Sequence, residues 1–124
     1  MELKEIIEGN KIIRGYDKIP DYVAAMALGD EYWYTIVSRY HKCWNQLMRV
    51  ISQIEQEKFN VDIDKYTTRI TFVDYHAGWT DFVFESERYP DKIERTWHAV
   101  IAFIKWWNEN KDKPNFIPPS GREP

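Results

Sequence analysis

Residues 59–74 read FNVDIDKYTTRITFVD, and their alternation of apolar and polar side chains decides the fold class. Phe59–Ile63 alternates with a period of two, as expected for a strand that buries one face. The same period continues through Tyr66–Asp74. We expect this second strand to direct one set of side chains to the core: Tyr66, Thr68, Ile70 and Phe72. The stretch therefore predicts two neighbouring strands of a small sheet.

A turn and a third strand follow directly. Tyr75-His76-Ala77-Gly78 supplies a turn with a conformationally permissive glycine. Trp79–Glu87 then runs back, with Phe82 and Phe84 alternating against Val83. Together the three segments predict an antiparallel β-meander whose last two strands pair as a hairpin.

An amphipathic helix is predicted before the strands, over residues 40–57. Its apolar side chains recur at helical spacing and form one stripe, made of Trp44, Leu47, Met48, Ile51 and Ile54. The opposite face is polar and holds Lys42, Gln46, Arg49, Gln53 and Gln56. We expect the apolar stripe to pack against the sheet.

A second amphipathic helix is predicted after the strands. Asp91-Lys92-Ile93-Glu94 has the capping-box pattern, in which a side-chain acceptor is followed three residues later by Glu, and Pro90 precedes it. The apolar stripe of this helix consists of Ile93, Trp97, Val100, Ile101 and Ile104. The helix must end before Pro114, and the Pro-rich residues 113–124 are predicted to form a C-terminal tail.

The N-terminal third of the chain is less regular. We expect a short helix over residues 1–8, ended by Gly9 as a C-terminal cap, and a further turn or two of helix over residues 21–28. Tyr32–Val37 is rich in aromatic and β-branched residues, which predicts an edge strand or an extended approach to the next element. The whole pattern predicts an α+β fold, with a small antiparallel sheet packed with two main amphipathic helices in a sandwich-like arrangement and a short N-terminal helix. We assign residues 1–112 to a single domain.

Composition narrows the classes of partner and the location. A formal net charge of −3 and a pI of about 5.6 give no general attraction to nucleic acid or to anionic lipid, which need clustered Lys and Arg. No apolar stretch approaches the roughly 18 residues that a membrane span requires, and the N-terminus is too acidic for a signal peptide. Cys43 is the only cysteine, so an intramolecular disulfide cannot form. We expect a cytoplasmic protein without a membrane or nucleic-acid partner.

The residue types of catalytic and metal sites are present without the corresponding motifs. His41, His76 and His98 lack a spacing that would place two imidazoles on one helical face, and His41 and Cys43 alone cannot make a site. A lone cysteine beside an apolar stripe is more often a small core residue than a nucleophile. Two pairs of carboxylates stand close together in sequence: Asp62 with Asp64, and Glu85 with Glu87. They would favour a hydrolase only if the fold brought two of them together in a cleft. We therefore expect no catalytic residue, no metal and no cofactor.

Aromatic residues make up 16% of the chain, more than two helical stripes need. Exposed Trp and Tyr provide large rigid surfaces that anchor protein partners or stack bases. The candidates for a partner-binding or ligand-binding site are rings outside the stripes: Trp33, Tyr34, Tyr75, Trp79, Trp106 and Trp107. Three arginines could face the phosphates of a nucleotide-like ligand: Arg69, Arg88 and Arg95. The alternative is that these rings only cap a small core from its rim.

The two helices also carry a family resemblance. Residues 40–55, YHKCWNQLMRVISQIE, resemble the first helix of the phage ABA-sandwich domain family, which typically opens with Tyr-His and continues with Trp and Leu-Met. Residues 92–108, KIERTWHAVIAFIKWWN, are similar to the last helix of that family. Lys42, Cys43 and Arg49 depart from the family pattern. The resemblance implies a helix-and-sheet sandwich from phages or mobile elements, working in a bacterial host cell, and it implies no particular activity or catalytic residue.

These observations favour a non-enzymatic binding or interaction module of phage or prophage type that has a protein partner or associates with itself. The alternative is a ligand-sequestering protein that binds a nucleotide-like small molecule through aromatic and Arg residues. Convergence of Trp33, Trp79 and Trp107 on one pocket would favour ligand binding over packing at the rim of the core.

Overall fold

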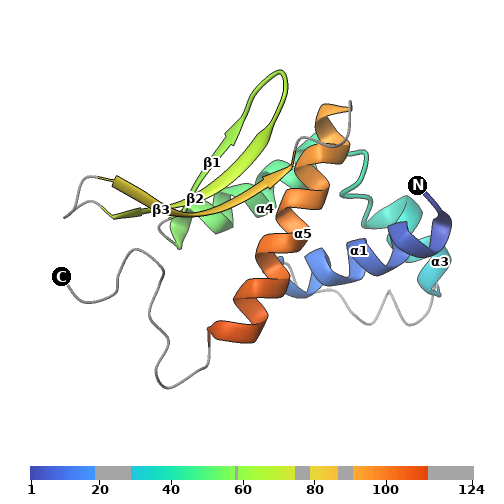
Figure 1. The fold of residues 1–124 in the computed structure, drawn as a ribbon. Coiled ribbons are helices and arrows are strands. Elements are labelled where there is room, and N and C mark those ends of the chain that lie inside the picture. Colours follow the sequence, from blue (N-terminus) through green and yellow to red (C-terminus); the bar gives the residue numbers. More distant parts are fainter. Residues whose placement is uncertain (19–28, 58, 75–78, 87–90, 112–124) are drawn as a thin grey trace.

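The chain has an α+β fold in the computed structural model (Figure 1). The structure describes residues 1–18, 29–57, 59–74, 79–86 and 91–111. Helix α5, Lys92–Asn110, runs through the middle of the molecule and contacts β2 and β3 of the sheet on one side. Helix α1, Leu3–Tyr16, packs against α5 on the other side. The predicted fold class is confirmed.

The sheet consists of β1 (Phe59–Ile63), β2 (Thr68–Asp74) and β3 (Trp79–Ser86), in that spatial order. Both strand pairs are antiparallel, and the register places Val61 opposite Ile70. The predicted meander and its hairpin are therefore confirmed. The alternation seen in the sequence survives in β1, where Phe59 is buried while the intervening polar residues are exposed.

The turn between β1 and β2 corrects one expectation. Tyr66 was expected to face the core, but it lies before the first residue of β2 and its side chain is largely exposed. The carboxylate of Asp64 accepts hydrogen bonds from the backbone N–H groups of Tyr66 and Thr67, each at 2.7 Å. These two N–H groups are bonded to the Asp64 side chain and not to a neighbouring strand. The chain therefore turns here, and β2 starts only at Thr68.

Helix α5 begins where the sequence predicted. Asp91 is its N-cap, and the Asp91 carboxylate accepts the backbone N–H of Ile93 at 3.1 Å. Most of the predicted stripe is buried, and the full set of buried apolar residues in the helix is Trp97, Ala99, Val100, Ile101, Phe103 and Ile104. The Thr96 hydroxyl lies 2.8 Å from the Thr68 hydroxyl, so a buried polar contact fixes α5 along β2.

Helix α4, Trp44–Gln56, packs against β1 and shares one core with α5. Its buried residues are Leu47, Val50, Ile51 and Ile54. On the other face of the sheet the polar side chains of Asn60, Asp62 and Arg69 are exposed. Both main helices therefore cover the same face of the sheet, as the two apolar stripes predicted.

The stripe of α4 is shifted from the one expected. Trp44 and Met48 were expected to be buried, but they are 37% and 43% exposed, and Val50 takes a core position instead. The reason is that polar residues fix the rotation of the helix: Arg49 and Gln53 bind the buried carboxylate of Asp17 at the end of α1. With that side of α4 turned toward α1, the edge that carries Trp44 and Met48 turns outward.

Gly9 does not end the first helix. α1 continues through it to Tyr16, and Gly9 is buried where the helix crosses α5. A Cβ at this position would lie 2.1 Å from Cζ2 of Trp97 and 2.7 Å from Cδ1 of Ile101. The expected C-terminal cap was wrong. A glycine is needed here because the two helices approach too closely for any side chain.

Tyr32–Val37 is helical, so the predicted edge strand is wrong. The segment consists of α3, Asp30–Tyr32, and of a π-helical turn η1, Trp33–Val37. Its backbone groups are satisfied locally, since the N–H of Ser38 donates to the carbonyl of Trp33 at 2.7 Å. The strand preference of aromatic and β-branched residues reflects packing on a pleated surface. Here the segment packs against α1, and that tertiary contact outweighs the preference.

Other expectations lie outside the described residues. These are the helix over residues 21–28, the turn over residues 75–78 and the tail over residues 113–124.

Candidate functional site

The predicted site residues fall into separate parts of the fold. Trp33 and Tyr34 lie in η1, whereas Trp106 and Trp107 lie in the last turns of α5. Arg69 is exposed on β2, Arg95 is buried on α5, and Trp79 is the first residue of β3. Tyr75 and Arg88 lie outside the described residues, as does His76. The structure thus brings together Trp33 with Tyr34, and Trp106 with Trp107.

Trp106 and Trp107 pack against the edge of the core. The ring centroid of Phe59 lies 6.0 Å from that of Trp106 and 6.5 Å from that of Trp107, both in edge-to-face geometry. The ring of Phe103 stacks on Trp107 at 6.0 Å. Both indoles are only partly exposed. These contacts support the interpretation that this pair covers the core from its rim.

Arg95 holds the turn between β1 and β2. It is 2% exposed, and its Nη2 donates to the backbone carbonyls of Asp64 and Lys65 at 3.0 and 3.1 Å. Hydrogen bonds from the backbone N–H groups of Thr67 and Tyr66 lower the pKa of Asp64 in the same turn. Arg95 is therefore engaged with the protein backbone at this turn, and it is buried where a phosphate-binding arginine would be open to ligand.

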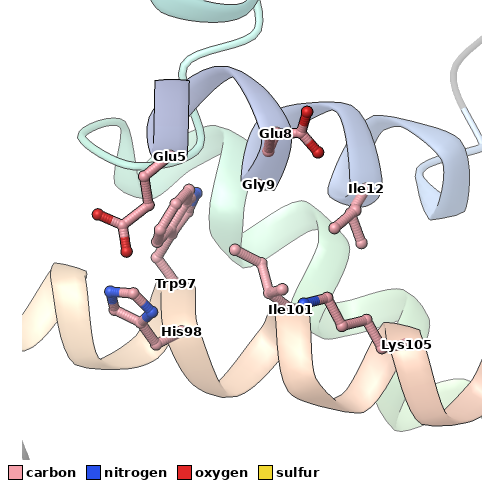
Figure 2. A pocket seen from close by; sticks show the side chains of 8 residues that line it. All are labelled: Glu5, Glu8, Gly9, Ile12, Trp97, His98, Ile101 and Lys105. Atoms are coloured by element: carbon pink, nitrogen blue, oxygen red, sulfur yellow. The ribbon is translucent and has the colours of Figure 1, made fainter. Parts of the chain in front are cut away.

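The groove between α1 and α5 is small (Figure 2). Glu5 extends from α1 toward Trp97 and His98, and Glu8 also lines the groove from α1. The cavity volume of the groove is about 180 Å³. Sites for small molecules usually occupy about 300–1,000 Å³. The groove can accommodate a few waters or the end of a side chain, but it is too small to enclose a nucleotide.

The η1 turn has the features of a functional surface. Isolated π-helical turns are rare and are found frequently at functional sites. Trp33 points inward and is 4% exposed, and its Nε1–H has no hydrogen-bond acceptor among the described residues. A buried indole donor without a partner is a costly feature in a native structure. The turn is therefore held in this geometry by its surroundings and not by its own preferences.

Three large apolar side chains point outward from the same segment. Tyr32 and Ile36 are each 50% exposed, and Val37 is 36% exposed. A π-helical turn contains more residues than an α-helical turn, so Ile36 and Val37 both lie over Tyr32 one turn later. We call these three side chains the η1 face. Sequence reasoning named none of the three as a site residue, and an extended segment would place Ile36 and Val37 on opposite sides.

Asn10 anchors the η1 turn from inside. Its side chain is fully buried in α1, and its Nδ2 donates to the backbone carbonyl of Tyr34 at 2.5 Å. The same nitrogen lies 2.9 Å from Nδ1 of His41, and Oδ1 accepts from Nε1 of Trp97 at 2.8 Å. One amide thus connects α1, η1, the segment before α4, and α5.

The charged side chains before and after the η1 face in the sequence have opposite signs. Asp30 and Glu31 precede it, and Arg39 and Lys42 follow it. Asp30 forms an ion pair with Lys11 at 2.6 Å, and the ammonium of Lys11 lies 5.7 Å from the ring centroid of Tyr34. Within the part of the chain that the structure describes, the exposed side chains of Glu31, Arg39 and Lys42 form no ion pair.

Comparison with protein-family models, curated proteins and solved structures finds no match. No helix among the described residues is long and apolar enough to cross a membrane. Over the same residues, no group of three or more His, Cys, Asp and Glu side chains is arranged to hold a metal ion. Function must therefore be inferred from the geometry of the surface.

Proposed function

We propose that this protein is a non-enzymatic interaction module that associates with a second copy of itself through the η1 face. The observation that carries the proposal is the exposure of Tyr32, Ile36 and Val37 together on a π-helical turn. Three neighbouring apolar side chains of this size are costly to leave in water, and such clusters mark contact surfaces.

The charges support a second copy as the partner. A twofold contact places each part of a surface opposite a different part of the same surface in the partner. With acids before the η1 face and bases after it, a twofold axis through Ile36 sets Glu31 of one protomer opposite Arg39 and Lys42 of the other. Complementary charge of this kind fixes orientation and excludes wrong partners more than it adds affinity.

The size of the η1 face predicts a weak contact. Fully burying a large apolar side chain contributes about 1.5–3 kcal/mol, and these side chains are already about half covered. Six of them across a twofold contact therefore supply roughly 5–9 kcal/mol, against an association cost of at least about 4 kcal/mol. The difference is at most about 5 kcal/mol, so the dissociation constant is expected to be no tighter than about 200 µM.

Origin and cellular location stay part of the proposal. The resemblance of residues 40–55 and 92–108 to the phage ABA-sandwich domains favours a phage or prophage protein acting in the bacterial host cytoplasm. Among the described residues, the groove between α1 and α5 is too small for a nucleotide and Arg95 is buried, so neither feature supports the ligand-sequestering alternative.

Ile36→Lys is expected to abolish self-association. A charge at the centre of the contact would have to be desolvated without a partner, which costs more than the contact supplies. Sedimentation velocity from about 10 µM to about 1 mM should show a sedimentation coefficient that rises with concentration for the native chain and stays monomeric for the variant. Met48→Lys is the matched control, because Met48 is a similarly exposed apolar residue on α4. A native chain that remains monomeric throughout, or an equal loss in Met48→Lys, contradicts the proposal.

Charge reversal tests the twofold arrangement separately. Glu31→Lys and Arg39→Glu should each weaken association, because each brings like charges together across the axis. The double variant should recover much of the native association, since it exchanges the two signs. The check is the dissociation constant at low and high salt, where the differences should shrink at high ionic strength. Additive losses in the double variant would rule out this orientation.

A further inference from the structure

The orientation of the Asn10 amide is fixed by its neighbours. The indole Nε1–H of Trp97 is only a donor, so the atom it meets at 2.8 Å must be the amide oxygen of Asn10. The amide nitrogen then faces the other way, toward the carbonyl of Tyr34 and Nδ1 of His41. Because the Tyr34 carbonyl is only an acceptor, both ends of the amide agree on this orientation.

This arrangement determines the state of His41. Both N–H bonds of the Asn10 amide are used, one toward Tyr34 and one toward His41, so Nδ1 of His41 must accept. The imidazole is therefore neutral and carries its hydrogen on Nε2. A proton on Nδ1 would point directly at a second N–H donor that cannot turn away, since Trp97 holds the amide oxygen on the other side.

The surroundings of His41 also oppose the charged form. Burial lowers the pKa of His41, and the positive charges of Lys42 and Arg39 lower it further. From α1 the group that faces the ring is the neutral amide of Asn10. No described carboxylate contributes to this shift.

We propose that proton uptake by Nδ1 of His41 is a switch that loosens the η1 face on α1. On this proposal, which rests on the proposed self-association, one proton binds per chain and breaks the Asn10–His41 hydrogen bond. The segment between η1 and α4 keeps the bond from Tyr40 to Asp17 and those between Gln46 and the backbone of Val37 and Arg39, but it loses its contact with Asn10. The η1 face is then held less firmly, and the bound pair dissociates into protonated monomers.

The sign of the pH dependence follows from linkage. A group whose pKa is depressed in the folded state stabilises that state above its unfolded pKa of about 6.5 and loses this contribution as the pH falls through the folded pKa. For association the two states are the free monomer and the bound pair. The bound pair requires neutral His41, so protons bind the free monomer in preference to the pair. Below the His41 pKa of the monomer the dissociation constant should therefore rise by up to about tenfold per pH unit for each proton taken up.

The test combines NMR on the monomer with sedimentation. At low concentration the His41 ring should titrate below pH 6.5, and the Nε1–H signal of Trp97 should shift with the same midpoint. His41→Gln should abolish the Trp97 titration. His98 lies on α5 with its ring 4.9 Å from that of Trp97, so His98→Gln should move the position of the Trp97 signal but leave its titration midpoint unchanged. A His41 midpoint at or above about 6.5, or a Trp97 signal that ignores His41, would overturn the switch.

Sedimentation separates this switch from the function on which it rests. Association of the native chain should weaken as the pH falls through the His41 midpoint that NMR gives, and that of His41→Gln should change far less. Equal association of the native chain one pH unit above and one pH unit below that midpoint overturns the switch but retains the self-association. A monomer at every pH overturns the self-association, and the NMR titration then decides on the His41 switch alone.

Discussion

Gly9→Ala is expected to destabilise the protein by about 1–3 kcal/mol, the usual cost of overpacking a filled core. The new Cβ would lie 2.1 Å from Cζ2 and 2.4 Å from Cη2 of Trp97. The indole cannot move aside easily, because it is 1% exposed and its Nε1 is bonded to the buried Asn10. α1 would have to move away from α5, which opens the core at the crossing. Urea unfolding measures the effect as a lower midpoint with an unchanged m value.

The expected destabilisation by Gly9→Ala is opposite in sign to the usual effect of this substitution in a helix. Inside an ordinary helix alanine is favoured over glycine by about 0.5–1 kcal/mol. Gly15 provides the matched control, because it lies in the same helix, is exposed, and a Cβ there would meet nothing within 4 Å. Gly15→Ala should therefore raise the urea midpoint while Gly9→Ala lowers it. Midpoints that move in the same direction would show that α1 does not approach α5 as closely as described.

The sheet and α5 could be predicted because their sequence signals are local and redundant. In β1 and β2 a period of two repeats over several residues, and a register shift by one would turn every apolar side chain outward. α5 has a cap at Asp91 and an apolar stripe that begins in its first turn, at Ile93. Each signal alone is weak, but they agree, so the prediction was confirmed.

The wrong predictions concern residues whose role depends on contacts with residues distant in the sequence. Gly9 looks like a cap in the sequence, and only the Trp97 ring, far along the chain, gives the reason for its missing side chain. The rotation of α4 likewise depends on Asp17, a carboxylate in another helix. The apolar spacing of α4 fits two rotations, and the polar partners choose between them. A count that included Val50 in the stripe would have indicated the correct one.

The candidate site was predicted in part. Trp33 and Tyr34 were named from their aromatic character and do lie in the η1 turn, but there they form its inner side. The outer residues Ile36 and Val37 look like strand residues in the sequence. A π-helical turn has no sequence signature comparable to a period of two or 3.6, because it depends on contacts with α1.

Asp17→Ala is expected to destabilise the protein by about 2–4 kcal/mol. The Asp17 side chain is fully buried and joins the end of α1 to the segment before α4 and to α4 itself. Its Oδ2 accepts from the Tyr40 hydroxyl at 2.7 Å and from Nη2 of Arg49 at 2.6 Å, and Oδ1 accepts from Nε2 of Gln53 at 2.9 Å. Without the carboxylate the buried Tyr40 hydroxyl loses its acceptor, whereas Arg49 is 40% exposed and can turn to water. The expected loss of unfolding free energy is therefore smaller than for breaking an ion pair in which both groups are fully buried.

The same network predicts a specific dependence on pH. Burial alone would raise the pKa of Asp17, but the hydrogen bonds from Arg49, Gln53 and Tyr40 outweigh it and lower the pKa below its ordinary value. A carboxyl group with a depressed folded pKa stabilises the fold above its unfolded pKa of about 3.9 and loses that contribution as the pH falls through the folded pKa. The difference in unfolding free energy between the native chain and Asp17→Asn should thus be constant from about pH 5 to pH 8 and shrink below about pH 4.

Asp30→Asn is the control that separates the effect of the buried Asp17 carboxylate from the effect of losing an exposed ion pair. Asp30 also forms an ion pair at 2.6 Å, with Lys11, but both side chains are well exposed. An exposed pair exchanges its partner for water at little cost, so this variant should keep the native urea midpoint at every pH. Parallel urea titrations of the native chain, Asp17→Asn and Asp30→Asn between about pH 3 and pH 8 give the comparison. If Asp17→Asn tracked Asp30→Asn across that range, the buried carboxylate would not be what joins α4 to α1, and the rotation that exposes Trp44 and Met48 would need another cause.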